Sequence, residues 1–296
     1  MNAYTKRDWL TGLISVWLWA FSTTAWASPP HLSPIQVILV GDSTLAPKNG
    51  YGDALCARFV PQVKCINLAK NGRSSGSYRA EGSWQSVLDL LKQAQGTLPT
   101  YVLIEFGHND QPGKPGRSTD LVTEFPRNLS RYVQEVRALG GQPLLATPLT
   151  RRNFKGDQLV HDLEPWADAT RQVGLEEKVP VLELLQVSSA AIQTLGHAQA
   201  DTLAVEPPPA AHQIEIQGSS LERSDSGAIG ASGKSSASVT SAKVDLNQLE
   251  PVSPQKSAFD HTHVGPKGAA FFAEQMEELM RKTLPEWPLY FQIQKP

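Results

Sequence analysis

The chain has 296 residues, of which 40% are hydrophobic, and its 27 basic residues nearly balance 29 acidic ones. This length and composition suit one α/β core of ordinary size. A net charge of −2 leaves no broad basic face, which argues against nucleic acid or an anionic membrane surface as a partner.

The first 27 residues have the pattern of a signal peptide. Lys6 and Arg7 precede an apolar stretch over residues 10–24, and Ala25-Trp26-Ala27 fits an A-x-A cleavage site. The apolar stretch is shorter than the roughly 20 residues that a membrane span needs, so cleavage is favoured over an uncleaved anchor. We therefore expect no stable membrane insertion, a periplasmic or secreted location, and a single domain over residues 28–296.

A short β-branched run at 35–40 leads directly into Gly41-Asp42-Ser43-Thr44. The run is typical of a buried strand in a parallel sheet, and open α/β sheets bind ligands just past the carboxyl ends of their strands. We expect the Ser43 hydroxyl to lie near the N-terminus of a following helix, whose free N–H groups favour negative charge. Ser43 is a candidate nucleophile, although in isolation these residues also fit a turn with an N-cap.

The two cysteines of the chain are Cys56, in a helix-like segment over 51–59, and Cys65, in a second predicted strand over 63–68. In an exported protein they could close a short disulfide between the helix and the strand. Two buried free thiols are the alternative, and the sequence does not decide between them because it does not give the distance.

Polar loops follow the strand at 63–68 and a third predicted strand at 100–106. Gly72 could present a bare main-chain N–H without steric cost, and the Asn109 side-chain amide follows the third strand. Both suit an oxyanion hole, in which one donor is typically worth roughly 10²–10³ in rate. Taken alone, Gly72 is an ordinary loop glycine and Asn109 an Asx-turn residue.

Strand-like and helix-like runs alternate along the chain. Strands are predicted near 35–40, 63–68, 100–106, 142–147 and 180–183, and helices over 83–93, 125–139, 162–178, 184–195 and 267–283. This rhythm predicts a three-layer α/β/α sandwich around a five-stranded parallel sheet. Trp84 and Trp166 could stack on sugar rings, but their helix-like surroundings favour packing in the core.

The rhythm breaks at about 198–257, a segment rich in Ser, Gly, Ala and Pro with almost no aromatic residues. Such a composition buries too little apolar surface to offset its ordering entropy. We predict a disordered insertion rather than an ordered lid, and it ends beside the next candidate site residues.

Asp260 and His263 stand three residues apart, just before the last predicted helix. A serine nucleophile needs a neutral imidazole to take its proton, and the imidazole needs an acceptor that fixes its tautomer. A helix cap beside a surface histidine is the alternative. No zinc-type spacing is present, and a triad explains His261 and His263 better than metal ligation beside His108, so we expect no metal and no other cofactor.

Together these segments resemble the four sequence blocks of the SGNH (GDSL-type) hydrolases, and the chain is most similar to the rhamnogalacturonan acetylesterases. The match runs from about Val37 to Lys282, interrupted by one long insertion. The residues that carry it are Gly41-Asp-Ser-Thr44, Asn71-Gly-Arg-Ser-Ser75 with Ser77-Tyr78, Gly107-His-Asn-Asp110 and Asp260-His-Thr-His263 with Gly265-Pro266.

The resemblance implies a flavodoxin-like strand order and a catalytic triad. Ser43 would be the nucleophile, His263 the general base and Asp260 its orienting acid, with an oxyanion hole formed by the main-chain N–H groups of Ser43 and Gly72 and by the Asn109 amide. Arg73, Tyr78 and His108 are candidate substrate-binding residues.

The expected function is the removal of O-acetyl groups from a cell-wall polysaccharide, with rhamnogalacturonan or a related pectin as the expected partner. Two alternatives stay open: a GDSL-type esterase or lipase that acts on other short acyl esters, and a carbohydrate-binding protein without catalysis.

Overall fold

The computed structural model describes residues 32–206 and 259–293, all of which belong to one folded unit that begins at Leu32. The predicted signal peptide at 1–27 and residues 207–257 of the predicted insertion lie outside the described residues.

Five parallel strands form the main sheet in the order β2-β1-β3-β4-β7, which is the flavodoxin-like order that the resemblance to the SGNH hydrolases implies. The strands are β1 (Ile35–Gly41), β2 (Val63–Asn67), β3 (Thr100–Glu105), β4 (Gln142–Ala146), β7 (Val181–Leu182), and a separate antiparallel pair, β5 (Phe154–Lys155) and β6 (Gln158–Leu159). The helices are α1 (Gly52–Cys56), α2 (Ser77–Ala80), α3 (Ser83–Ala94), α4 (Glu124–Ala138), α5 (Glu164–Glu177), α6 (Leu184–Asp201), α8 (Pro266–Thr283) and the 3₁₀ turn η1 (Trp287–Tyr290).

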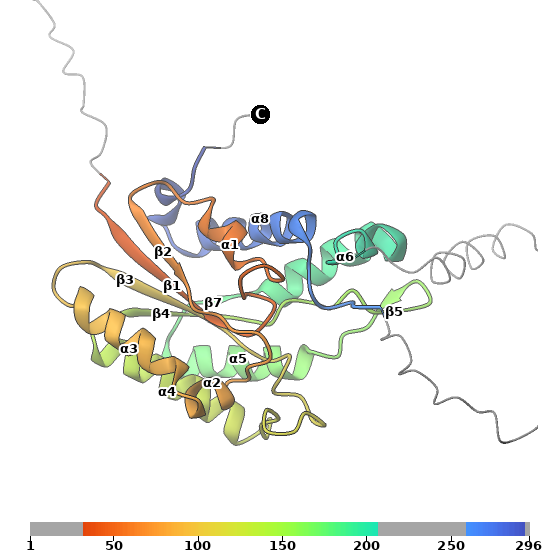
Figure 1. Ribbon diagram of the computed structural model, residues 1–296, viewed down its shortest axis with the longest axis horizontal. Coiled ribbons are helices and arrows are strands. Elements are labelled where there is room, and N and C mark those ends of the chain that lie inside the picture. Colours follow the sequence, from red (N-terminus) through yellow and green to blue (C-terminus); the bar gives the residue numbers. More distant parts are fainter. Residues whose placement is uncertain (1–31, 207–258, 294–296) are drawn as a thin grey trace, which may run out of the picture. The chain divides into compact units, whose positions relative to one another are not determined.

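Side chains on the two faces of the sheet enter two separate cores. Val37 and Leu39 of β1 pack with α1, α6 and α8, whereas the alternate residues Ile38 and Val40 pack with α3, α4 and α5. Figure 1 shows these two groups of helices on opposite faces of the sheet. The predicted three-layer sandwich is thus confirmed, and Trp84 and Trp166 both lie in the second core.

The helix expected directly after Ser43 is absent. Residues 42–50 form successive turns, and α1 begins only at Gly52. Pro47 has no N–H to donate, and Lys48 has a φ of 76°, so the chain cannot enter a helix before this point. The prediction of a helix N-terminus at the Ser43 hydroxyl is therefore wrong.

The helix predicted over 184–195 also ends later than expected. Gly196 has a φ of 73° and a ψ of 167°, which no helix allows, yet helical structure resumes after this kink and α6 continues to Asp201. Ala200 and Leu203 are buried in the first core. The folded part of the chain therefore includes residues 198–206, which the sequence assigned to the start of the insertion.

Cys56 at the end of α1 and Cys65 in β2 form a disulfide, with their Cα atoms 5.4 Å apart. The question left open by the sequence is thus resolved in favour of the bond, which joins the first helix to an edge strand of the sheet. Among the described helices, none is both long and apolar enough to cross a membrane.

Candidate active site

The predicted site residues follow neighbouring strands at one edge of the sheet. Ser43 follows β1, Gly72 lies in the loop after β2, and Asn109 follows β3. Because these strands are parallel and adjacent, their carboxyl ends meet at the same edge. Ser43 is 5% exposed and Asn109 is 6% exposed, so both side chains lie in a largely enclosed environment.

Asp260 and His263 form the predicted acid–base pair. His263 Nδ1 lies 2.7 Å from Asp260 Oδ2, while Asp260 Oδ1 accepts hydrogen bonds from the main-chain N–H groups of Thr262 at 2.8 Å and His263 at 3.0 Å. Burial acts to raise the pKa of Asp260, but these hydrogen bonds outweigh burial and lower it. The ionised carboxylate can only accept, so the imidazole carries its proton on Nδ1 and keeps Nε2 free to act as a base.

The loop that carries His263 is joined to the turn that carries Ser43. Val264 N–H donates to the Asn49 carbonyl at 3.0 Å. Burial raises the pKa of Asp42, next to Ser43, and hydrogen bonds from Thr44 and the nearby charge of His263 oppose that rise. Within residues 32–206 and 259–293 the Ser43 hydroxyl has no hydrogen-bond partner, so the Asp–His half of the predicted triad is formed and the Ser–His contact is not.

Three hydrogen-bond donors are available for an oxyanion. Asn109 Nδ2 donates one hydrogen to the Arg73 carbonyl at 3.0 Å, which leaves its second hydrogen unused. Gly72 has a φ of 74°, and neither its main-chain N–H nor that of Ser43 donates a hydrogen bond to another described residue. Their assignment to an oxyanion hole stays a prediction.

A buried contact joins the loops that carry Gly72 and Asn109. Asp110 Oδ1 accepts from the Ser75 hydroxyl at 2.6 Å and from the Thr119 hydroxyl at 2.8 Å, and the Tyr132 hydroxyl donates to the Ser75 carbonyl at 2.7 Å. Burial raises the pKa of Asp110 to about 6, against the effect of these hydrogen bonds. The contact fixes the second and third sequence blocks relative to each other.

Sequence reasoning missed Arg152, which follows β4 and is 0% exposed. Its Nη2 donates to the carbonyls of Asp260 and His263, each at 2.9 Å, and its Nη1 donates to that of Thr262 at 3.3 Å. Its main-chain N–H donates to the His261 carbonyl at 2.8 Å. Arg152 therefore holds all four carbonyls of the segment 260–263. The only sequence signal was a pair of arginines after an apolar strand.

A second missed residue is Glu105, the last residue of β3, which is buried beneath the turn that carries Ser43. It accepts from the Thr44 hydroxyl at 3.0 Å, from the main-chain N–H of Leu149 at 3.2 Å, and from the Tyr51 hydroxyl. Burial, with a contribution from the charge of Asp42, raises the pKa of Glu105 to about 8. A single glutamate within an otherwise apolar strand was the signal that could have indicated it.

The predicted substrate-binding residues differ in their surroundings. Tyr78 is 0% exposed, with its hydroxyl donating to the Leu68 carbonyl at 2.7 Å and its ring packed edge-on against Phe106. It is a core residue, so the prediction for Tyr78 is wrong. It was misjudged because its loop position suggested exposure, whereas the short helix α2 turns the ring inward.

Substrate binding by His108 and by Arg73 stays a prediction. His108 is 2% exposed, its Nε2 is 2.8 Å from the Leu149 carbonyl, and burial lowers its pKa well below the usual value, so the ring is neutral. Arg73 is partly exposed and is paired with Glu81 at 2.7 Å.

Comparison with known proteins agrees with this arrangement. Residues 31–214 match the GDSL-like Lipase/Acylhydrolase family. Two proteins of Bacillus subtilis are similar in sequence: the rhamnogalacturonan acetylesterase RhgT, 33% identical over 58% of this chain and 74% of its own length, and the probable rhamnogalacturonan acetylesterase YesY, 30% identical over 52% and 72%.

In three dimensions, the crystal structure of protein YxiM from Bacillus subtilis has a similar fold, with a TM-score of 0.55 at 17% identity. The similarity covers 85% of this chain but only 57% of that one. The chain belongs to the GDSL-like lipase/acylhydrolase family and is a carboxylic ester hydrolase.

Proposed function

We propose that this protein removes O-acetyl groups from a cell-wall polysaccharide, and that its substrate is acetylated rhamnogalacturonan. The observation that carries the proposal is the combination of three unused oxyanion donors with the Asp260–His263 pair at one edge of the sheet. Two relatives named as rhamnogalacturonan acetylesterases, each matched over more than two thirds of its length, support the choice of substrate.

The chemistry would proceed in two steps. His263 Nε2 takes the proton of Ser43 as its Oγ attacks the acetyl carbonyl carbon, and the tetrahedral oxyanion accepts hydrogen bonds from the N–H groups of Ser43 and Gly72 and from the Asn109 amide. Collapse of the intermediate breaks the bond to the sugar oxygen, which takes the proton from His263 and leaves as a hydroxyl group. Water then attacks the acetyl-enzyme by the same route and releases acetate.

We propose further that the protein acts outside the cytoplasm, in the periplasm or the medium. The predicted signal peptide supports this location, and so does the Cys56–Cys65 disulfide, because such bonds persist in oxidising compartments. Cell fractionation, with mass spectrometry of the mature N-terminus, tests the proposal. Cleavage after Ala27 is the expected result, and an intact N-terminus in the cytoplasmic fraction would contradict it.

Acetate release from a panel of polymers tests the activity. The panel contains acetylated rhamnogalacturonan, acetylated xylan, peptidoglycan, and a chemically deacetylated rhamnogalacturonan as blank. We expect the highest kcat/KM on acetylated rhamnogalacturonan and no release by Ser43→Ala. Equal rates on all acetylated polymers would refute the proposed preference for rhamnogalacturonan but would not refute esterase activity.

Two other results would favour the alternatives. Hydrolysis of longer-chain chromogenic esters without acetate release from any polymer would indicate a general GDSL-type esterase. Binding to the polymer without any ester hydrolysis would indicate a carbohydrate-binding protein.

A further inference from the structure

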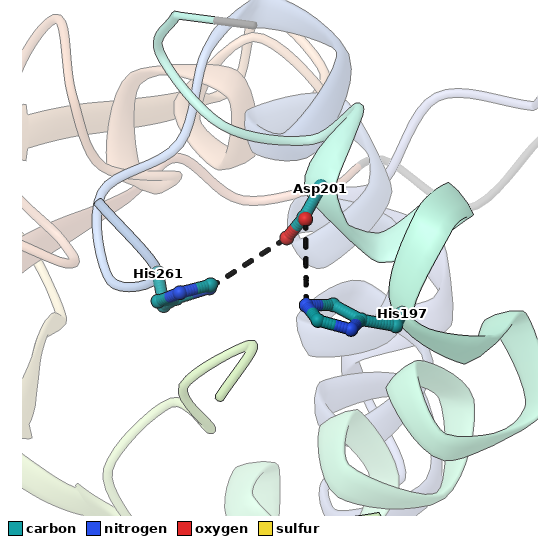
Figure 2. A group of neighbouring side chains, drawn as sticks. All are labelled: His197, Asp201 and His261. Carbon is teal, nitrogen blue, oxygen red and sulfur yellow. Dashed lines mark ion pairs between the residues drawn. The ribbon is translucent and has the colours of Figure 1, made fainter. Parts of the chain in front are cut away.

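A cluster of His197, Asp201 and His261 lies beside the catalytic segment, outside the predicted triad. His197 and Asp201 come from the last turns of α6, and His261 lies between Asp260 and His263. In Figure 2 both rings turn toward the Asp201 carboxylate, which lies between them. One ligand atom from each residue lies within 4.8 Å of the other two.

The spacing within the cluster is longer than that of hydrogen bonds. His197 Nε2 is 3.5 Å from one oxygen of Asp201, and His261 Nδ1 is 3.6 Å from the other. Hydrogen bonds between nitrogen and oxygen are typically about 2.7–3.2 Å long. Two ligands that each lie about 2.0–2.2 Å from a tetrahedral Zn²⁺ are, by contrast, roughly 3.3–3.6 Å apart. Both distances are close to this spacing and run to different oxygens of Asp201, so they fit an ion that contacts both oxygens of the carboxylate.

The backbone of α6 brings two of the ligands onto one face. His197 and Asp201 are four residues apart, which aligns them one above the other on a helix, as in other helical zinc sites. The kink at Gly196, with its φ of 73°, sets the direction of this last segment of α6. The conformation of Gly196 therefore sets the direction in which His197 and Asp201 point.

Aromatic contacts hold the two imidazole rings. The His197 ring stacks on Phe154 of β5, with centroids 5.1 Å apart and planes 22° apart, and the His261 ring meets Phe259 edge-on at 4.8 Å. The Asp201 side chain is fully buried, whereas each histidine side chain keeps about a quarter of its surface exposed. The carboxylate is thus withdrawn from bulk water while an ion could still enter past the rings.

We propose that His197, Asp201 and His261 bind a divalent metal ion, for which Zn²⁺ is the best match. Neutral imidazole nitrogens and one carboxylate are ligands that zinc favours, whereas calcium and magnesium favour sets of oxygen ligands. Water or a further side chain would complete the coordination. The sequence did not indicate this site because Asp201 fell within the predicted insertion at about 198–257, far along the chain from His261.

The position of the cluster gives the ion a role. His261 is adjacent to Asp260, and α6 packs in the first core, so the ion joins the segment that carries the proposed acid–base pair to a fixed helix. This role rests on the proposed function, whereas metal binding itself does not. The Arg152 guanidinium is the cation that competes with a metal ion for the Asp201 carboxylate. Burial lowers the pKa of Arg152, and the charges of Asp260 and Asp201 both oppose that effect.

The test measures metal content and thermal stability rather than activity, so its failure is distinct from failure of the proposed function. The full chain is stripped with a chelator, incubated with one equivalent of Zn²⁺, desalted, and analysed for zinc by mass spectrometry. We expect about one zinc ion per chain in the wild type and an increase in Tm on loading, because binding to the folded state alone stabilises it.

His197→Gln keeps the size and polarity of the side chain but ligates zinc poorly, so it should lose both the zinc and the increase in Tm. His161→Gln, at an exposed histidine outside the cluster, should keep both. Asp201→Asn is a second variant with the same expected loss. The proposal is overturned if the stripped wild type retains no zinc after desalting, or if His197→Gln and Asp201→Asn retain as much as the wild type.

Discussion

The Asn109 amide is oriented from both of its ends. Nδ2 donates to the Arg73 carbonyl at 3.0 Å, and Arg117 Nη1 approaches Oδ1 at 3.4 Å. The two contacts favour a single orientation, so the unused amide hydrogen is directed before any substrate binds. A donor fixed in advance stabilises charge that develops only in the transition state.

Asn109→Ala should therefore lower kcat by about 10²-fold or more and change KM little. Steady-state kinetics on a chromogenic acetate ester provide the measurement, with Asn153→Ala, at an exposed asparagine, as control. A change in KM alone would mean that the amide contacts the ground state, and the assignment to the oxyanion hole would be wrong.

At the scale of elements, the segment 260–263 has no regular secondary structure and depends on Arg152 for its shape. Four successive carbonyls accept hydrogen bonds from this one residue, three of them from the guanidinium. The guanidinium is a rigid planar fork, so it can fix several acceptors at once, whereas an ammonium group on a flexible stem cannot.

Arg152→Lys keeps the charge and removes the fork. We expect kcat to fall by about 10- to 100-fold with a small change in KM, because displacement of His263 affects the chemical step more than binding. The variant is assayed below its melting transition, with Arg137→Lys as control. If kcat is unchanged while Tm falls, Arg152 has a structural role only.

The disulfide joins two further elements, α1 and β2, across nine positions of sequence. Closing a loop of this length restricts the unfolded chain and typically adds about 2–3 kcal/mol. Cys56→Ser with Cys65→Ser should lower Tm by roughly 5–10 °C in calorimetry. Wild type treated with a reductant should melt like the double variant, and a Tm equal to that of the oxidised wild type would contradict the prediction.

At the scale of the whole molecule, the sequence predicted those features of the fold that leave a regular pattern of apolar residues. The apolar runs and their spacing indicated the five strands of a parallel sheet and the edge at which Ser43, Gly72 and Asn109 follow them, whereas the strand order was expected from the resemblance to the SGNH hydrolases. These features repeat along the chain, because every strand of a buried parallel sheet must be apolar and every crossover needs a helix. Asp260 and His263 were identified because a serine nucleophile needs an imidazole base and a carboxylate that fixes its tautomer.

The sequence could not predict the buried polar support. Arg152 and Glu105 are single residues whose partners are distant in sequence, so no local pattern identifies them. Gly196 likewise looked like the end of a helix, and only the burial of Ala200 and Leu203 explains why α6 continues. Tyr78 was misjudged for the same reason, since burial depends on tertiary packing.

Glu105 also affects the stability of the whole molecule. Its pKa is raised to about 8 by burial and by Asp42, whose pKa burial raises too, whereas in the unfolded chain the glutamate titrates near 4.5. Between these values the folded state binds more protons than the unfolded state. The free energy of unfolding therefore decreases as pH rises through this window, by up to about 1.4 kcal/mol per pH unit for one proton.

Glu105→Gln removes this titration while its side-chain oxygen can still accept from Thr44 and Leu149. The difference in Tm between the variant and the wild type should therefore increase in favour of the variant from pH 5 to pH 8. Glu274→Gln, at an exposed glutamate of α8, should show no such trend. A Tm difference that stays constant or decreases over this range would show that Glu105 is ionised in the folded protein at pH 5, and that the network beneath Ser43 holds a carboxylate rather than a neutral acid.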